Sequence, residues 1–340
     1  MSLTFWIVII VSLIIRAYRA SSDDTNTQPA ISAQDMIVLQ HLERWQKSLD
    51  IRDYATAEAE LNAAEAAHKG TAVPAMLFVR RGIVRFLRQN YTGADADMNR
   101  SEKRDKYTSG TGGGMEAGDY VMRAEVRLFV GRLKEAIAEL EKCKIIPQGD
   151  LHQGKIARLL GIAHYCQGDM PAAARNWAHG AGNVSDSTFL MRWCALTRMG
   201  AEAGATRELE GLDNATFHEK DADAVWYDYI RKYLIGRLSA EQLLQHATSL
   251  STDEKAQGMR KCQASFYIAA ALQGKDKEEA LFELNNCLWR KETSAYESLM
   301  AQADLNRLKP AEPPSSAPPT ALGGAGRVIR PSPPAPSSSA

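Results

Sequence analysis

The chain has 340 residues, of which 45% are hydrophobic and 24% are charged, as in ordinary folded proteins. Lysine plus arginine and aspartate plus glutamate balance at 41 each, so no overall charge favours nucleic acid or an acidic partner. Its five cysteines form no CxxC motif and no metal-ligand spacing. This pattern favours buried thiols over a disulfide or a metal role.

The first feature along the chain is an uncharged apolar run over residues 3–15. It is short for a membrane-spanning helix and fits the core of a secretory signal better. No basic residue precedes it, however, whereas Arg16 and Arg19 follow. An uncleaved anchor, an atypical export signal and a start codon placed too late all stay open. We expect residues 1–20 to be a membrane anchor or signal, and the polar residues 21–33 to be a linker.

The stretch from Gly161 to Trp177 has the pattern of a helix, a tight turn and a second helix. Gly161 lets a neighbouring helix approach closely, and the Gly168-Asp169 pair ends the first helix. Ala173 gives the second helix another close contact, and Trp177 adds bulk one turn later. This order of small and large residues is typical of a tetratricopeptide (TPR) unit, which repeats about every 34 residues.

Copies of this pattern recur along the chain. Alanines at the equivalent position are spaced by 37, 42 and 37 residues, at Ala57, Ala94, Ala136 and Ala173, and Ala280 is a further copy. The interval before Ala280 has room for two more helix pairs, over Phe189–Gly211 and Ala222–Ser249. The sequence therefore predicts an all-α fold for residues 34–308, a TPR-like right-handed α-solenoid of about six helix pairs with a capping helix. An unrelated helical bundle is the alternative.

No motif predicts catalysis. The seven histidines are scattered without HxxxH or HExxH spacing, and GxSxG and GxGxxG are absent. The glycine-rich stretch at Thr108–Gly118 lacks the lysine of a phosphate-binding loop and is interpreted as a flexible insertion. We expect a non-enzymatic protein without catalytic residues, cofactor or metal, although a composite active site stays open.

The concave surface of a solenoid, lined by the first helix of each pair, is its usual binding surface. Mainly apolar positions are predicted there, with one arginine and one glutamate: Leu42, Gln46, Val79, Ile83, Val121, Glu125, Arg158, Ile162 and Tyr165. Such a lining favours an apolar or amphipathic protein segment, the chain's own tail or a twin subunit. The alternative is that these residues pack against adjacent helices.

Arginines cluster on two successive helices, at Arg80, Arg81, Arg85, Arg88, Arg123 and Arg127. A basic stripe of this kind would suit a ligand rich in phosphate, so a nucleic-acid-binding solenoid is one alternative. Five acidic residues lie nearby in sequence and could neutralise the stripe, at Asp95, Asp97, Glu116, Asp119 and Glu125.

Residues 309–340 are rich in proline, serine and alanine, and bulky apolar residues are almost missing. Such a segment cannot bury enough surface to fold, so a disordered tail is predicted. Its stretch from Arg330 to Pro336 matches an RxxPxxP pattern of polyproline recognition.

Within residues 191–308 several motifs are more specific than a TPR consensus. They are the segments starting at Trp193 (WCAL), Tyr233 (YLIGRLSAEQL), Cys262 (CQASFYI) and Gly274 (GKDKEEA), and the helix over Tyr296–Leu308. This region resembles the carboxyl-terminal part of bacterial TPR proteins related to envelope lipoproteins that act as adaptors for a periplasmic processing protease.

The resemblance implies a non-enzymatic adaptor of the bacterial envelope, membrane-anchored or periplasmic, with the membrane side left open. Its implied partners are protein segments, a protease or assembly complex, or a second copy in a homodimer. The chain departs from this family by lacking the lipidated cysteine and by adding the proline-rich tail. A regulatory or enzyme-associated ligand-binding solenoid is the alternative function.

Overall fold

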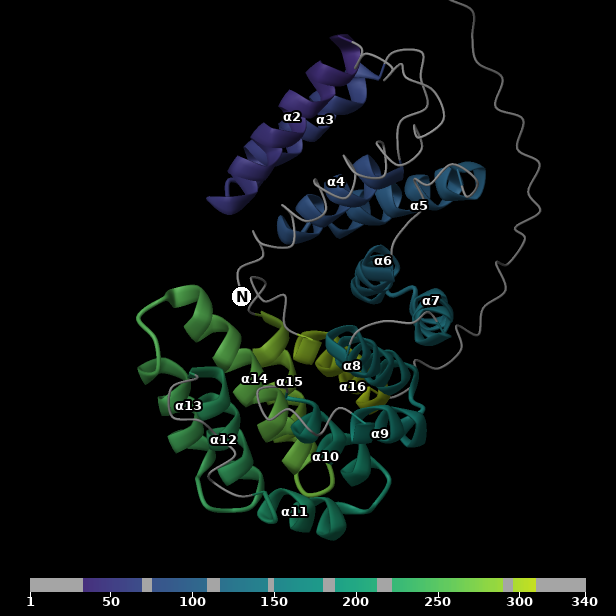
Figure 1. The fold of residues 1–340 in the computed structure, drawn as a ribbon. Coiled ribbons are helices and arrows are strands. Elements are labelled where there is room, and N and C mark those ends of the chain that lie inside the picture. The colour runs from purple at the N-terminus through teal and green to yellow at the C-terminus, as the bar shows by residue number, and fades with distance from the viewer. Residues whose placement is uncertain are drawn as a thin grey trace, which may run out of the picture.

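The computed structural model describes residues 33–68, 75–108, 117–145, 150–179, 187–212, 222–289 and 296–309. Regular structure within these ranges is helical throughout, and the helices stack as antiparallel pairs along a curved path (Figure 1). The predicted TPR-like α-solenoid is thereby confirmed. The predicted segments 1–20 and 309–340 lie outside the described residues, except for Lys309 at the end of the last range.

The described helices form seven pairs and a closing helix, one pair more than predicted. Both pairs inferred before Ala280 are present. The bounds are α2 (Ala33–Asp50), α3 (Tyr54–Ala67), α4 (Ala75–Leu87), α5 (Tyr91–Thr108), α6 (Ala117–Phe129), α7 (Leu133–Ile145), α8 (Asp150–Gln167), α9 (Met170–His179), α10 (Thr188–Arg198), α11 (Glu202–Glu210), α12 (Ala222–Leu234), α13 (Ala240–Ser249), α14 (Glu254–Leu272), α15 (Lys277–Trp289) and α16 (Tyr296–Leu308).

The turn between α8 and α9 shows how the repeat pattern dictates the local fold. Gly168 has a φ of 93°, in the left-handed region that favours glycine. Asp169 then accepts a hydrogen bond from the backbone N–H of Ala172 and caps the start of α9. Gly161 has no Cβ, so the Trp177 ring packs directly against its backbone. The small and large positions of the repeat thus interlock the two helices.

The apolar core is unevenly distributed along the solenoid. One large cluster runs from α6 to α16 and includes the buried rings of Trp177, Trp193 and Trp226. The first two helix pairs have only two small clusters, one around Trp45 and Leu61 and the other around Met98. The amino-terminal pairs therefore depend more on polar contacts, which are described below.

One cysteine interpretation is corrected by the structure. Cys287 was expected to be a free buried thiol, but it forms a disulfide with Cys262 that joins α15 to α14. Sequence spacing gave no sign of this pair, because it depends on the register of two adjacent helices. Cys143, Cys166 and Cys194 are free thiols, and Cys143 and Cys194 are buried as expected.

Helix α16 returns to the middle of the chain. It packs against α14 and α15 and also against α8, so that the carboxyl-terminal units curl into a closed bundle (Figure 1). One side of α8 is therefore covered by a helix of the same chain. Of the helices described, none is long and apolar enough to cross a membrane.

Candidate functional site

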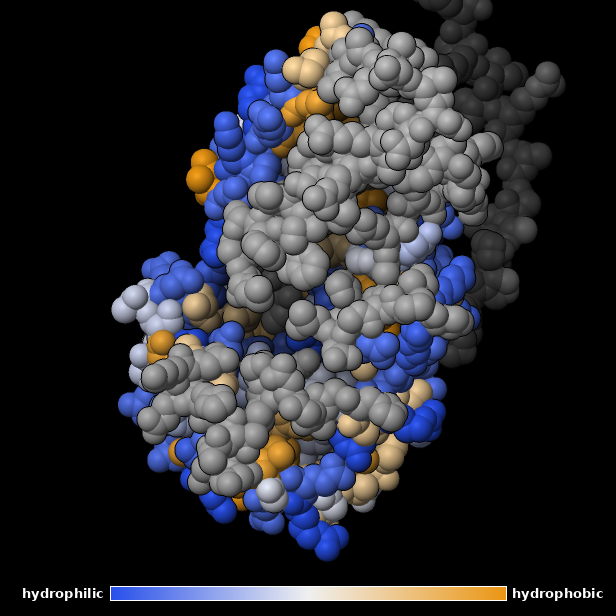
Figure 2. All heavy atoms as spheres, in the orientation of Figure 1, coloured by the Kyte–Doolittle hydropathy of each residue, from blue (hydrophilic) through white to orange (hydrophobic). Residues whose placement is uncertain are grey.

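The predicted groove residues on α2 and α4 lie near an accessible surface. Leu42, Gln46 and Ile83 are half-buried. Gln46 donates a hydrogen bond to the Asp50 carboxylate, 2.8 Å away on the same helix. Hydrophobic residues lie among hydrophilic ones along α2 (Figure 2), where Leu39 is exposed one turn before Leu42. Leu42 and Ile83 also pack against the two small amino-terminal clusters, so each side chain lies partly in the interior and partly at the surface.

Other predicted groove residues lie in the interior. Val79 packs with Ala94 and Met98, and Val121 and Ile162 belong to the large core cluster. Their side chains are at most 2% exposed. An apolar residue on the first helix of a pair can face either the groove or the second helix, and spacing alone does not separate the two. These three side chains are not part of an open surface.

The remaining predicted residues are brought together beneath α16. The carboxylate of Glu125 on α6 accepts a hydrogen bond from the Tyr296 hydroxyl and pairs with Lys155 at 2.6 Å. The Arg158 guanidinium carbon lies 5.4 Å from the centroid of the Tyr296 ring. Burial, followed by the nearby Glu125 charge, raises the pKa of Tyr296. The first turn of α16 therefore contacts two residues that were predicted to bind a partner, Glu125 and Arg158.

The last turns of α16 are held by a buried carboxylate. The Asp304 side chain is 1% exposed and accepts a hydrogen bond from Gln273 at 3.0 Å. It also accepts one from the Tyr165 hydroxyl and pairs with Arg198 and Arg307. Asp304 thus connects α8, α10 and α14 to α16. Sequence reasoning missed it, because a single aspartate near a helix end carries no pattern.

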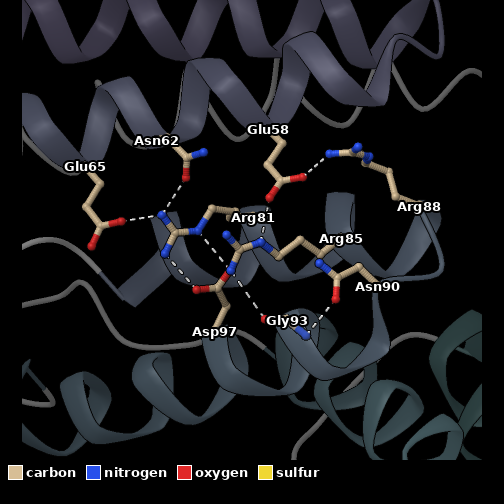
Figure 3. A network of polar contacts seen from close by, with 9 residues as sticks. All are labelled: Glu58, Asn62, Glu65, Arg81, Arg85, Arg88, Asn90, Gly93 and Asp97. Atoms are coloured by element: carbon tan, nitrogen blue, oxygen red, sulfur yellow. Dashed lines mark hydrogen bonds and ion pairs between the residues drawn. The ribbon is translucent and has the colours of Figure 1, made fainter.

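The arginines of α4 lie in an ion-pair network between helix pairs (Figure 3). Arg81 contacts both oxygens of Asp97 on α5, at 2.9 and 2.7 Å, and also pairs with Glu65 on α3. Arg85 bridges Glu58 and Asp97 at 2.8 Å each. Burial opposes the charge of Arg81, but its hydrogen bonds to Asp97 and Glu65 outweigh burial and raise its pKa. The network joins α3, α4 and α5.

The same arrangement recurs one repeat later. Glu139 on α7 pairs with both Arg123 and Arg127 of α6, and Arg127 also reaches Glu102 on α5 at 2.9 Å. Arg132 pairs with Asp95 at 2.8 Å. Carboxylates therefore pair with five arginines of the predicted basic stripe, at Arg81, Arg85, Arg88, Arg123 and Arg127. Of the acidic residues expected to neutralise the stripe, Asp97 does so, whereas Asp95 pairs with Arg132, outside the stripe. These guanidinium groups hold adjacent repeats together and do not form an open cationic surface.

Comparisons with known proteins gave matches among solved structures. No protein-family model matches the chain, and no curated protein matches it significantly. A TPR protein from Parabacteroides merdae is similar at a TM-score of 0.48 and 12% identity, covering 80% of this chain and 99% of that one. The carboxyl-terminal part of a TPR repeat-containing protein from Cytophaga hutchinsonii matches at 0.44 and 15% identity, covering 75% and 97%. The TPR2AB domain of yeast Sti1, in complex with an Hsp90 peptide, matches at 0.29 and 13% identity, covering 80% and 97%.

Proposed function

We propose that this chain is a non-enzymatic scaffold that binds amphipathic helical segments of partner proteins along its concave surface. The observation that carries this proposal is the position of α16. This helix lies against Glu125, Arg158 and Tyr165, three residues at positions predicted to contact a partner. Since the concave surface accepts a helix of the chain itself, its shape suits a helix from another protein.

The surface available to a partner lies on the first helices of the amino-terminal pairs. Leu39, Leu42 and Gln46 follow helical spacing on α2. Ile83 is half-buried on α4. The guanidinium of Arg80 lies 4.7 Å from the Trp45 ring centroid, so α2 and α4 are in contact beside this surface. Apolar residues with a polar rim favour an amphipathic helix over a nucleic acid.

The ion-pair networks weigh against the nucleic-acid alternative. A protein that binds phosphates needs arginine or lysine groups whose charge is available to the ligand. Arg81, Arg85, Arg123 and Arg127 each pair with at least one carboxylate of the same chain. A partner that contacts apolar residues is therefore the better fit.

We place this scaffold at the bacterial envelope, anchored by or exported through residues 1–20. The uncharged apolar run over residues 3–15 supports this placement. A disulfide between Cys262 and Cys287 also supports it, since structural disulfides persist mainly in oxidising compartments. Reporter fusions at the carboxyl end, with and without residues 1–20, test the placement. Unchanged location after deletion of residues 1–20 would contradict it.

Site-specific photo-crosslinking in the native host tests the binding surface. A photoreactive phenylalanine at position 83 should form covalent adducts with a partner. The same residue at Ala138, which is exposed on the second helix of a pair, is the matched control. Adducts at position 83 should persist at high salt, because screening acts on charges and not on buried apolar area. Equal labelling at both positions would overturn the proposal.

A further inference from the structure

Helix α15 presents two large aromatic side chains to solvent. Phe282 is 58% exposed and Trp289 is 81% exposed, although most tryptophans in this chain's described part are buried. The two residues are seven positions apart, so they lie on one face of the helix, two turns from each other. Glu278 is also exposed, one turn before Phe282 on the same face. We call Glu278, Phe282 and Trp289 the α15 face.

The chain outside the described structure starts close to one end of this face. Gln273, which directly follows α14 and precedes the turn into α15, donates a hydrogen bond to Asp304 in the last turns of α16. The end of α16 therefore lies beside the beginning of α15. Residues 310–340 continue from that point.

We propose that the α15 face binds the proline-rich tail of the same chain, through the segment Arg330–Pro336. The segment reads RPSPPAP, with prolines three positions apart at Pro331 and Pro334, and again at Pro333 and Pro336. Polyproline II rises ~3.1 Å per residue, so these two rings are ~9 Å apart along the segment. Seven residues of an α-helix span ~10.5 Å. The proline spacing therefore matches the distance between Phe282 and Trp289 along α15.

Charge complementarity sets the direction of binding. Arg330 directly precedes Pro331, and Arg327 lies one turn of polyproline II earlier. Glu278 and Glu279 are exposed at the first turn of α15, next to the exposed Lys277, and Glu278 lies one turn before Phe282. With Arg330 against these carboxylates, Pro331 reaches Phe282 and Pro334 reaches Trp289. Aromatic side chains are the usual surface on which such segments dock.

The tail is long enough for this contact. The 20 residues between Lys309 and Arg330 include five prolines and a Gly-Gly-Ala-Gly stretch. A random coil of that length would have an end-to-end distance of ~25 Å, by the scaling of ~5–6 Å times the square root of residue number, and a polyproline II segment would reach ~60 Å at ~3.1 Å per residue. Helix α15, with 13 residues, is ~20 Å long. No stretched chain is required to bring Arg330 to Glu278.

Fluorine NMR of the full-length protein labelled with 5-fluorotryptophan tests the proposal. The Trp289 resonance is assigned by its loss in Trp289→Phe. In the wild type it should be shielded from a soluble paramagnetic agent. The double variant Pro331→Ala, Pro334→Ala should shift this resonance and remove the shielding. The matched control Pro318→Ala, Pro319→Ala changes two tail prolines outside the segment and should leave the resonance in place.

Charge reversal gives a second, independent readout. Arg330→Glu should expose Trp289 to the paramagnetic agent, and combining it with Glu278→Arg and Glu279→Arg should restore the shielding. An identical Trp289 resonance in the wild type and the Pro331/Pro334 variant would overturn the proposal. So would shielding that depends on protein concentration, because it would place the tail or α15 face of a second copy there. The measurement does not involve the concave surface, so it stands or fails separately from the proposed function.

Discussion

The hydroxyl of Tyr165 on α8 lies 2.9 Å from a carboxylate oxygen of Asp304 on α16 and donates a hydrogen bond to it. The two residues are 139 positions apart in the chain. Both side chains are buried, and the Asp304 charge adds to burial in raising the pKa of Tyr165. This contact, together with Arg198, fixes α16 against α8 and α10.

Changing Asp304 to asparagine should therefore destabilise the carboxyl-terminal units. The substitution keeps the size of the side chain but removes the charge that Arg198 faces in the interior. Breaking a buried ion pair by removing one partner costs about 3–5 kcal/mol. The midpoint of urea unfolding should fall accordingly. Asn306→Ala, at an exposed position of the same helix, should leave this midpoint nearly unchanged. An equal fall of the midpoint in both variants would contradict a stabilising role of the Asp304–Arg198 pair.

Arg81→Lys should weaken the junction between the first two helix pairs. Lysine keeps the charge but cannot contact both oxygens of Asp97 while also reaching Glu65. Hydrogen bonds to charged groups contribute about 1.5–3 kcal/mol each, so a loss of about 2 kcal/mol is expected. Hydrogen exchange of α3 and α4 measures it locally. Arg237→Lys, at an exposed turn, is the control, and unchanged protection in Arg81→Lys would contradict the prediction.

The repeat pattern predicted the helix pairs well, because each pair follows from local spacing. The small residues Gly161 and Ala173 and the bulky Trp177 interlock as expected, since their roles depend only on adjacent helices.

Contacts between distant helices were beyond sequence reasoning. The burial of Val79 and Ile162 depends on how the first helix of a pair is rotated about its own axis. Helical spacing in the sequence is compatible with more than one such rotation. The covering of Glu125 by Tyr296 depends on the curvature of the whole stack. The pairing of Arg81 with Asp97 was within reach, because opposite charges at equivalent turns of paired helices meet.

Gly161→Ala should destabilise the fourth helix pair. A Cβ at this position would overlap the buried ring of Trp177, which has no free space to move into. Overpacking of a core costs about 1–3 kcal/mol. Gly154→Ala lies in the same helix with nothing near its added methyl, so it should stabilise the protein by about 0.5–1 kcal/mol. Urea unfolding of the two variants should therefore shift in opposite directions, and a shared direction would refute the packing explanation.

Glu297→Gln should change how stability depends on pH. Burial raises the pKa of Glu297 above its ordinary value of 4.5, although hydrogen bonds from Gln263 and Tyr267 act against this shift. Because the folded protein holds this proton more tightly than the unfolded chain, the contribution of Glu297 to stability is fully present below pH 4.5. It is lost as the pH rises through the raised pKa of the folded state. Glutamine stays neutral, so the variant should gain stability over the wild type at neutral pH, and the difference should shrink as the pH falls toward 4.5.

Urea unfolding at a series of pH values measures this difference in stability, with Asn306→Ala as a control that adds no titrating group. A pH-independent difference between Glu297→Gln and the wild type would show that the carboxyl group does not titrate in this window.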